Sequence, residues 1–224
     1  VQAYKRELIM SDNHKLLQDN PVIPLVQADD PDTAIATSRA LAAGGLHVVE
    51  VVFRTDRALE CLQAVAAEVP EVVAGAGTVL TAAQAEAALE HGAKFLVCPG
   101  LDDDIVRLAK DRGVAVYPGI MTPSELQHAF NLGLDIVKFF PASIAGGIPA
   151  LKALSSVFRS VRFMPTGGVS AANLADFLAI PAVIACGGSW LTPADAIAAG
   201  NYDKVTELAA EAVAIARQAR PATG

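Results

Sequence analysis

Eight short runs of apolar, mostly β-branched residues recur along the chain, and their spacing limits the possible folds more than any other feature. Successive runs start roughly 20–27 residues apart, which leaves room in each interval for one strand and one crossover helix. Runs that are apolar at nearly every position are typical of parallel sheets covered on both faces. The eight runs are residues 22–27, 46–53, 71–79, 94–100, 114–120, 135–142, 161–168 and 182–190.

Helix-like stretches occupy the intervals between these runs. Residues 31–45 are rich in alanine and leucine and end in glycine, and residues 81–92 begin at a possible threonine cap and also end in glycine. Further along, Thr122 is placed as an N-cap, with Pro123 at the first helical position and Glu125 three residues after the cap, which is a capping-box pattern. Strands therefore alternate with helices.

This alternation predicts an α/β protein, a single-domain (β/α)8 TIM barrel. The alternative, an open doubly wound sheet, usually carries a glycine-rich loop after its first strand, and residues 22–34 contain no glycine. No Pro-, Gly- or Ser-rich linker divides the chain, so we expect one barrel domain over residues 20–224, after an N-terminal extension or helix over residues 1–19. Met10 is a candidate for the natural start, in which case residues 1–9 are an addition.

The composition excludes several classes of function. Hydrophobic residues make up 53% of the chain and charged residues 18%, so a large core is readily buried, and the net charge is −7. No cluster of lysine and arginine predicts a nucleic-acid surface, and no apolar run is long enough to span a membrane. The charged start of the chain is unlike a secretory signal peptide. We therefore expect a cytoplasmic protein with no nucleic-acid or membrane partner.

Cysteine and histidine spacing predicts neither a redox motif nor a metal site. Cys61, Cys98 and Cys186 are far apart, and no pair has zinc-ligand spacing. We interpret them as buried thiols in a reducing cytosol. No metal and no cofactor is expected. The histidines, interpreted as surface or packing residues, are His14, His47, His91 and His128.

In a (β/α)8 barrel the chemistry lies at the carboxyl ends of the strands, and the second run carries two charged residues towards that end. Glu50 and Arg54 share the parity of Val48, so they can face one side of the strand, with Arg54 roughly 13 Å further along. A glutamate among valines is costly to bury unless it is paired or protonated. A structural ion pair explains Glu50 at least as well as an acid/base role does.

Lys138 stands in the middle of an apolar strand and shares a face with Ile136 and Phe140. Burial penalises the charged form of an amine, and a free amine is a nucleophile that forms Schiff bases with carbonyl compounds. The alternative is a structural pair with a core carboxylate, for which Glu50 is the obvious partner. A Lys–Glu pair at the mouth of a barrel can serve both purposes.

Glycines and a hydroxyl mark the ends of three further runs. Gly75 and Gly77 leave room for a ligand near the backbone, and Thr78 offers a hydroxyl, although tight packing with Thr78 as a helix cap explains the same pattern. The Gly-Gly pairs at 167–168 and 187–188 free backbone N–H groups at the starts of the following helices, which predicts a phosphate cradle. The alternative is that these glycines serve tight backbone geometry.

Together these residues would place an amine nucleophile, a carboxylate, an arginine, a hydroxyl and a phosphate pocket at one end of the barrel. A protonated imine is an electron sink, so an imine beside an acid/base group can make or break a C–C bond next to a carbonyl without a metal. The combination predicts this class of reaction.

The chain resembles the bacterial 2-keto-3-deoxy-6-phosphogluconate (KDPG) aldolases, also called 4-hydroxy-2-oxoglutarate (KHG) aldolases, over residues 20–217. KFFPA followed by PTGG and GGSW is specific to that family in this order, and VVEVVFRT, GAGTVLT, CPG and YPGIMTPSEL precede them. The resemblance implies a cytoplasmic, homotrimeric, metal-free class I aldolase. Such an enzyme cleaves KDPG, a phosphorylated 2-keto-3-deoxy sugar acid, to pyruvate and glyceraldehyde 3-phosphate, and KHG to pyruvate and glyoxylate.

The resemblance also implies roles for individual residues. Lys138 would form the Schiff base and Glu50 would be the general acid/base. Arg54 and Thr78 would bind the pyruvyl carboxylate, and Pro99 would line the same pocket. Phe140 would also bind the substrate. The hydroxyl and phosphate end of the substrate would be held by Thr166, Gly167, Gly168, Gly187, Gly188 and Ser189.

Two positions depart from the family pattern and leave the substrate range open. Val52 stands where many relatives have threonine, and Met121 where some have serine. The resemblance implies that Ser189 favours KDPG over its galacto-configured isomer, 2-keto-3-deoxy-6-phosphogalactonate. An aldolase for that isomer is the alternative within the family.

Two alternative functions lie outside this family. One is a phosphate-binding barrel isomerase, in which Lys138 only pairs with Glu50, and the other is a non-catalytic ligand-binding barrel. A lysine, a glutamate and an arginine together argue against the last.

Overall fold

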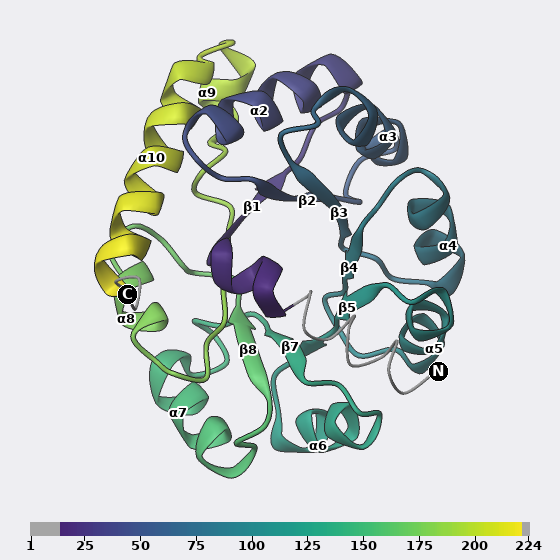
Figure 1. Cartoon of the computed structure of the whole chain (residues 1–224), viewed down its shortest axis with the longest axis vertical. Helices are drawn as coiled ribbons and strands as arrows, with labels where there is room; N and C mark the ends of the chain where they lie inside the picture. Colours follow the sequence, from purple (N-terminus) through teal and green to yellow (C-terminus); the bar gives the residue numbers. More distant parts are fainter. Residues whose placement is uncertain (1–13, 221–224) are drawn as a thin grey trace.

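A computed structural model describes residues 14–220, and its strands gather around the centre of the molecule with the helices outside them (Figure 1). Each of the eight predicted runs contains a β-strand. Run 114–120 contains two, because Pro118, which has no N–H to donate, separates β5 from β6. The strands are β1 Val22–Val26, β2 Val48–Val52, β3 Val73–Gly77, β4 Phe95–Val97, β5 Ala115–Tyr117, β6 Gly119–Ile120, β7 Ile136–Phe139, β8 Arg162–Pro165 and β9 Cys186–Gly188.

Neighbouring strands pair in parallel. A six-stranded sheet has the order β5-β4-β3-β2-β1-β9, and a three-stranded sheet has the order β6-β7-β8. Isolated parallel bridges, Phe163 to Val183 and Thr166 to Gly187, connect β8 with the segment around β9. The described residues therefore form an α/β fold built on a curled, parallel six-stranded sheet, which is a coarser result than the closed eight-stranded barrel expected from the sequence.

The helices pack outside the strands, and their caps follow the sequence closely. The Thr122 hydroxyl accepts a hydrogen bond from the N–H of Glu125, whose carboxylate accepts one from the N–H of Thr122, so the predicted capping box is confirmed. Thr81 caps α4 in a similar way. The helices are α2 Pro31–Ala43, α3 Ala58–Glu68, α4 Ala82–Glu90, α5 Asp103–Arg112, α6 Pro123–Asn131, α7 Gly147–Val157, α8 Leu174–Leu178, α9 Ala194–Ala198 and α10 Tyr202–Ala219.

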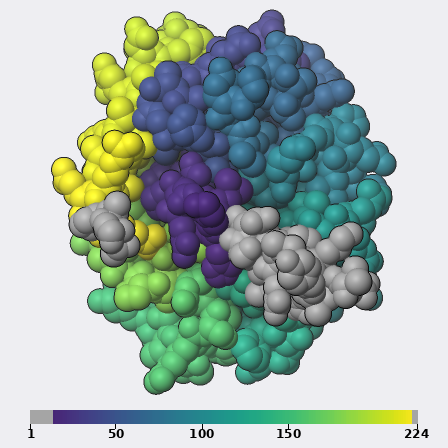
Figure 2. All heavy atoms as spheres, in the orientation of Figure 1, coloured from purple at the N-terminus to yellow at the C-terminus, as the bar shows by residue number. Residues whose placement is uncertain are grey.

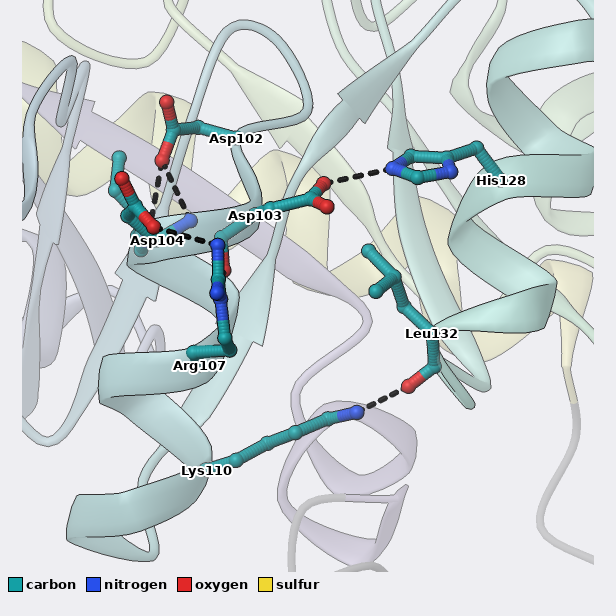
Figure 3. Close-up of polar contacts among 8 residues, drawn as sticks. Asp102, Asp103, Asp104, Arg107, Lys110, His128 and Leu132 are labelled. Atoms are coloured by element: carbon teal, nitrogen blue, oxygen red, sulfur yellow. Dashed lines mark hydrogen bonds and ion pairs between the residues drawn. The ribbon is translucent and has the colours of Figure 1, made fainter.

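Side chains on the surface join the neighbouring helices α5 and α6 (Figure 3). Nε2 of His128 lies 2.7 Å from Oδ1 of Asp103, and Lys110 donates to the carbonyl of Leu132 at the end of α6. Asp102 caps α5 by accepting hydrogen bonds from backbone N–H groups of its first turn. His128 is thus a surface residue, as predicted.

The hydrophobic core has two parts. A large cluster fills the space between strands and helices, and a smaller cluster lies inside the strands. Because Val48 and Ile136 belong to the inner cluster and strand side chains alternate, Glu50 and Lys138 also lie on the inward faces of β2 and β7. The inner cluster comprises Leu17, Ile23, Val48, Phe95, Val97, Ala115, Tyr117, Ile136, Met164, Ile184 and Ala185.

A short helix over residues 14–19 lies across the centre of one face, purple in Figures 1 and 2. Its Leu17 is only 1% exposed and belongs to the inner cluster, and Nε2 of His14 lies 2.7 Å from Oδ2 of Asp135, just before β7. This helix covers the amino ends of the strands, so a site on the inward faces is reached from their carboxyl ends.

Two sequence-based expectations remain untested by the fold. The predicted addition 1–9 and the start at Met10 lie outside the described residues, and the domain limits stay a prediction. Between residues 14 and 220, no helix combines the length and the apolar character that crossing a membrane requires.

We expect Thr122→Ala to lower the free energy of unfolding by about 1 kcal/mol, because it removes the hydroxyl that caps α6. Urea unfolding followed by circular dichroism measures the change. Ser124→Ala, at an exposed position in the same turn, is the matched control and should stay within about 0.5 kcal/mol of the wild type. Equal stability of the Thr122→Ala variant and the wild type would contradict the capping role.

The same cap predicts a pH dependence. Burial acts to raise the pKa of the Glu125 carboxyl, but hydrogen bonds from Met121 and Thr122 outweigh it and lower that pKa below its ordinary 4.5. A carboxyl with a lowered pKa contributes stability above its ordinary pKa and loses it as the pH falls through the folded value. The part of the difference between wild type and Thr122→Ala that comes from the Thr122 hydroxyl donating to the Glu125 carboxylate should therefore be full above pH 4.5 and shrink at lower pH.

Candidate active site

Lys138 and Glu50 meet inside the strands although 88 residues separate them in sequence. Nζ of Lys138 lies 3.4 Å from Oε1 of Glu50, and the two side chains are 3% and 0% exposed. The same Nζ lies 5.2 Å from the centre of the Phe140 ring. The structure therefore brings together the amine, the carboxyl group and the aromatic ring that were predicted from three positions in the sequence.

The second carboxyl oxygen of Glu50 has spare hydrogen-bonding capacity. Oε2 is buried and accepts no hydrogen bond from any described residue. A buried acceptor without a donor costs free energy, and buried groups that serve only structure are nearly always satisfied. This oxygen can accept a proton or a hydrogen bond from a bound molecule, which is compatible with an acid/base role for Glu50.

Protein atoms fill the space above Gly75 and Gly77, so the prediction that these glycines leave room for a ligand is wrong. A Cβ atom on Gly75 would lie 2.3 Å from the Phe95 ring, and one on Gly77 would lie 2.1 Å from Oε1 of Glu50. Both glycines make room for side chains of neighbouring strands. The signal in the sequence is a Gly-x-Gly strand that follows a strand with a buried glutamate.

Arg54 and Thr78 form a second group nearer to solvent. Nε of the exposed Arg54 donates to the Thr78 hydroxyl over 3.2 Å. Thr78 has φ of +57°, a left-handed conformation that is a genuine outlier for a β-branched residue. Thr81 caps α4, so the alternative that Thr78 is the helix cap is wrong. Backbone strain of this kind concentrates at functional sites.

The two Gly-Gly pairs lie close together, but they are not at helix starts as predicted. Gly187 and Gly188 belong to strand β9. Several loop residues follow each pair before the five-residue helices α8 and α9 begin, because Asn173 and Pro193 occupy their N-cap positions. Any anion at these loops would be held by loop backbone and not directly by a long helix.

Thr166 connects the two glycine loops. It is 3% exposed, it bridges to Gly187, and a Cβ on Gly187 would lie 2.3 Å from its hydroxyl oxygen. Gly167 and Gly168 have φ of +91° and +82°, which side chains other than glycine rarely adopt. Glycine is therefore required at positions 167 and 168 by the backbone conformation, which was the alternative interpretation of this pair.

The remaining predicted residues are located by the strands that they follow, since no contact with Lys138 or Glu50 is described for them. Pro99 follows β4 and is half-buried, and Ser189 follows β9 and is exposed. Carboxyl ends of parallel strands lie at one edge, so both residues belong to the same end of the fold as Lys138. Exposure rises along this end from the buried Glu50 to the exposed Arg54 and Ser189.

The thiols near this region are buried. Burial raises the pKa of Cys98 to about 12, although Lys138 acts in the opposite direction, and burial raises that of Cys186 to about 12. Cys61 is also buried, so the prediction of three buried free thiols is confirmed. Within residues 14–220, no group of three or more His, Cys, Asp or Glu side chains is arranged to hold a metal ion.

Two surface cavities lie elsewhere. One of about 490 Å³ adjoins Trp190 between α9 and α10, and one of about 300 Å³ lies between residues 18–22 and α10. Neither is lined by Lys138 or Glu50. The buried Lys138–Glu50 pair marks the candidate site.

Comparison with known proteins identifies relatives with the same elements. The model of the family described as KDPG and KHG aldolase matches residues 14–208. The KHG/KDPG aldolase of Escherichia coli (strain K12) is 46% identical over 198 residues, which are 88% of this chain and 93% of the relative. Most of each protein is therefore aligned.

Solved structures of KDPG aldolases resemble this chain in fold as well as in sequence. The KDPG aldolase of Zymomonas mobilis ZM4 with 3-phosphoglycerate is 42% identical, with a TM-score of 0.85 over 92% of this chain and 97% of its own. The KDPG aldolase of Legionella pneumophila, with pyruvate captured at low pH as a covalent carbinolamine intermediate, is 38% identical. Its TM-score is 0.85 over 88% of this chain and 96% of its own.

The strain at Thr78 predicts that Thr78→Gly stabilises the folded protein by about 1 kcal/mol, because relief of the left-handed conformation outweighs the freedom that glycine adds to the unfolded chain. Urea unfolding measures the change. Thr81→Gly, at an extended position three residues on, should instead be neutral or lose a few tenths of a kcal/mol. Clear destabilisation of the Thr78→Gly variant would show that Thr78 is not strained.

Proposed function

The chain belongs to the KDPG and KHG aldolase family, and on that premise we propose that it cleaves KDPG to pyruvate and glyceraldehyde 3-phosphate through a Schiff base on Lys138. The same chemistry extends to KHG, which yields pyruvate and glyoxylate. The protein is thus an aldehyde-lyase of class I. The observation that carries the proposal is the buried Lys138–Glu50 pair, with a free carboxyl oxygen, among the inward-facing side chains.

The reaction begins when Nζ of Lys138 adds to the C2 carbonyl of the substrate and forms a carbinolamine, which loses water to give a protonated imine. The C4 hydroxyl then loses its proton, the C3–C4 bond breaks, and its electron pair moves to the imine nitrogen. This releases glyceraldehyde 3-phosphate and leaves an enamine. A proton added at C3 gives the imine of pyruvate, and water hydrolyses it to pyruvate and the free amine.

Glu50 is placed to move the protons of these steps. Its Oε1 already lies 3.4 Å from the reacting nitrogen, and Oε2 is free to accept a proton from the carbinolamine or the C4 hydroxyl and to return it to C3. Glu50 is 0% exposed on a strand of valines, so its carboxyl group is shielded from bulk water, which strengthens its interactions.

The remaining residues bind the substrate. Arg54, braced by the Thr78 hydroxyl, supplies a positive charge for the pyruvyl carboxylate. Pro99 and Phe140 line the same pocket. The phosphate end is assigned to the two glycine loops and to Thr166 and Ser189, and the 3-phosphoglycerate in the Zymomonas structure supports a phosphate site in this family.

The architecture and assembly extend this proposal. The two sheets close into one (β/α)8 barrel. The bridges between β8 and the segment around β9 support closure on one side. On the other side, the N–H of Lys138 donates a hydrogen bond to the carbonyl of Pro118, the residue that separates β5 from β6. The enzyme is a cytoplasmic homotrimer. Exposed apolar side chains, which favour subunit contacts, include Leu80, Met121 and Ile144.

Two alternatives are less well supported. An isomerase without imine chemistry gives Lys138 no role beyond pairing with Glu50, and the carbinolamine in the Legionella relative favours covalent chemistry in the family. A 2-keto-3-deoxy-6-phosphogalactonate aldolase differs only in substrate configuration. Relative rates with the two sugar acids separate it from the proposed enzyme.

Lys138→Met should abolish cleavage of KDPG, because methionine keeps the length of the side chain and removes the nucleophile. Pyruvate release, measured by a coupled assay, should fall by at least about 10³-fold, the scale on which covalent catalysis contributes. Circular dichroism and unfolding establish that the variant is folded. A folded Lys138→Met enzyme with near-normal turnover would refute the assignment.

Glu50→Gln should slow proton exchange at the pyruvate methyl group by roughly 10²-fold or more, the usual contribution of a general acid/base, with much less effect on pyruvate affinity. Exchange into deuterated water is followed by proton NMR. Normal exchange in this variant would mean that another group is the base.

A further inference from the structure

We propose that Gly77 is a positioning residue: the absence of its side chain sets the place of the Glu50 carboxyl group beside Lys138. The inference rests on the proposed function of that pair. It assigns a catalytic consequence to a residue that touches no substrate.

The Glu50 side chain leans along its strand towards the carboxyl ends. The Cα atom of Glu50 is paired in register with Gly75 of β3, yet its carboxyl group lies over Gly77, two residues further on. A Cβ atom on Gly77 would lie 2.1 Å from Oε1, 2.4 Å from Cγ and 2.6 Å from Cδ of Glu50. Two residues of strand span about 6.6 Å, so the carboxyl group that lies 3.4 Å from Nζ of Lys138 is displaced along the strand from the register position of its own Cα atom.

The Glu50 side chain cannot move back to the position over Gly75. The position over Gly75, to which the side chain would retreat, is occupied by the Phe95 ring, which a Cβ atom on Gly75 would approach within 2.3 Å. Glu50 is fully buried, so a methyl group on Gly77 cannot push it into solvent. A side chain at position 77 therefore moves the carboxyl group away from its 3.4 Å contact with Nζ.

Glycine is needed at position 77 because a side chain has no room there, and not because of the backbone conformation. Gly77 is absent from the residues with positive φ, unlike Gly167 and Gly168. Its backbone is that of an ordinary strand residue paired in register with Val52, so alanine would be tolerated there if Glu50 were not in the way. The requirement for glycine thus comes from Glu50.

The test compares Gly77→Ala with Gly75→Ala, which adds the same methyl group on the same face of β3 but against the Phe95 ring. The readout is the rate of pyruvate methyl proton exchange, with the KM for pyruvate measured in parallel. Gly77→Ala should lower the exchange rate at least about tenfold with KM changed less than about threefold, because small misplacements of a catalytic group are costly. Gly75→Ala, in folded protein, should retain most of the exchange rate.

A double-variant comparison separates positioning from general damage to the strand. In the Glu50→Ala background the methyl group meets no carboxyl group, so adding Gly77→Ala should change the residual exchange rate less than about twofold. That double variant should also fold even where Gly77→Ala alone does not. Failure of the double variant to fold, where Glu50→Ala alone folds, would mean that β3 itself needs glycine there, which overturns the proposal.

The outcomes distinguish this inference from the proposed function. Wild-type protein that neither exchanges pyruvate protons nor cleaves KDPG defeats the proposed function. Wild-type exchange with an unaffected Gly77→Ala variant defeats only the positioning role. So does an equal loss in Gly75→Ala, or a further large loss on adding Gly77→Ala to Glu50→Ala.

Discussion

The contact between the Lys138 amine and the Glu50 carboxyl group, inside an apolar interior, is the interaction on which the rest of the site depends. Taking two ionisable groups out of water costs several kcal/mol each, and their attraction repays this only with good geometry and further hydrogen bonds. Here the separation is 3.4 Å and one carboxyl oxygen has no donor, so the pair is a poor stabilising device. Its arrangement is better explained by chemistry.

The fold isolates this pair on one side and opens it on the other. The helix over residues 14–19 inserts Leu17 among the inward-facing side chains at the amino ends of the strands. Towards the carboxyl ends, burial decreases until Arg54 is exposed. A substrate would thus meet a charged, polar rim first and a dry interior second, which suits a phosphorylated acid whose reacting carbonyl must reach an amine.

Features that depend on one strand or one helix were predictable from the sequence, and those that depend on the register between strands were not. Alternation predicted that Glu50 shares a face with Val48 and Lys138 with Ile136, and cap chemistry predicted the start of α6. Which side chain fills the gap over a glycine depends on the neighbouring strand, so Gly77 was interpreted wrongly. The Gly187–Gly188 pair was misplaced because the loop before α9 has no strong sequence signal.

The most direct test of the central claim is to incubate the protein with pyruvate and sodium borohydride, determine its intact mass and map the modified peptide. Borohydride reduces an imine to a stable amine, so the account predicts one covalent pyruvyl adduct per chain, located on Lys138 and absent from the Lys138→Met variant. An unmodified, folded protein, or an adduct on another lysine, would contradict it and leave Lys138 as the structural partner of Glu50.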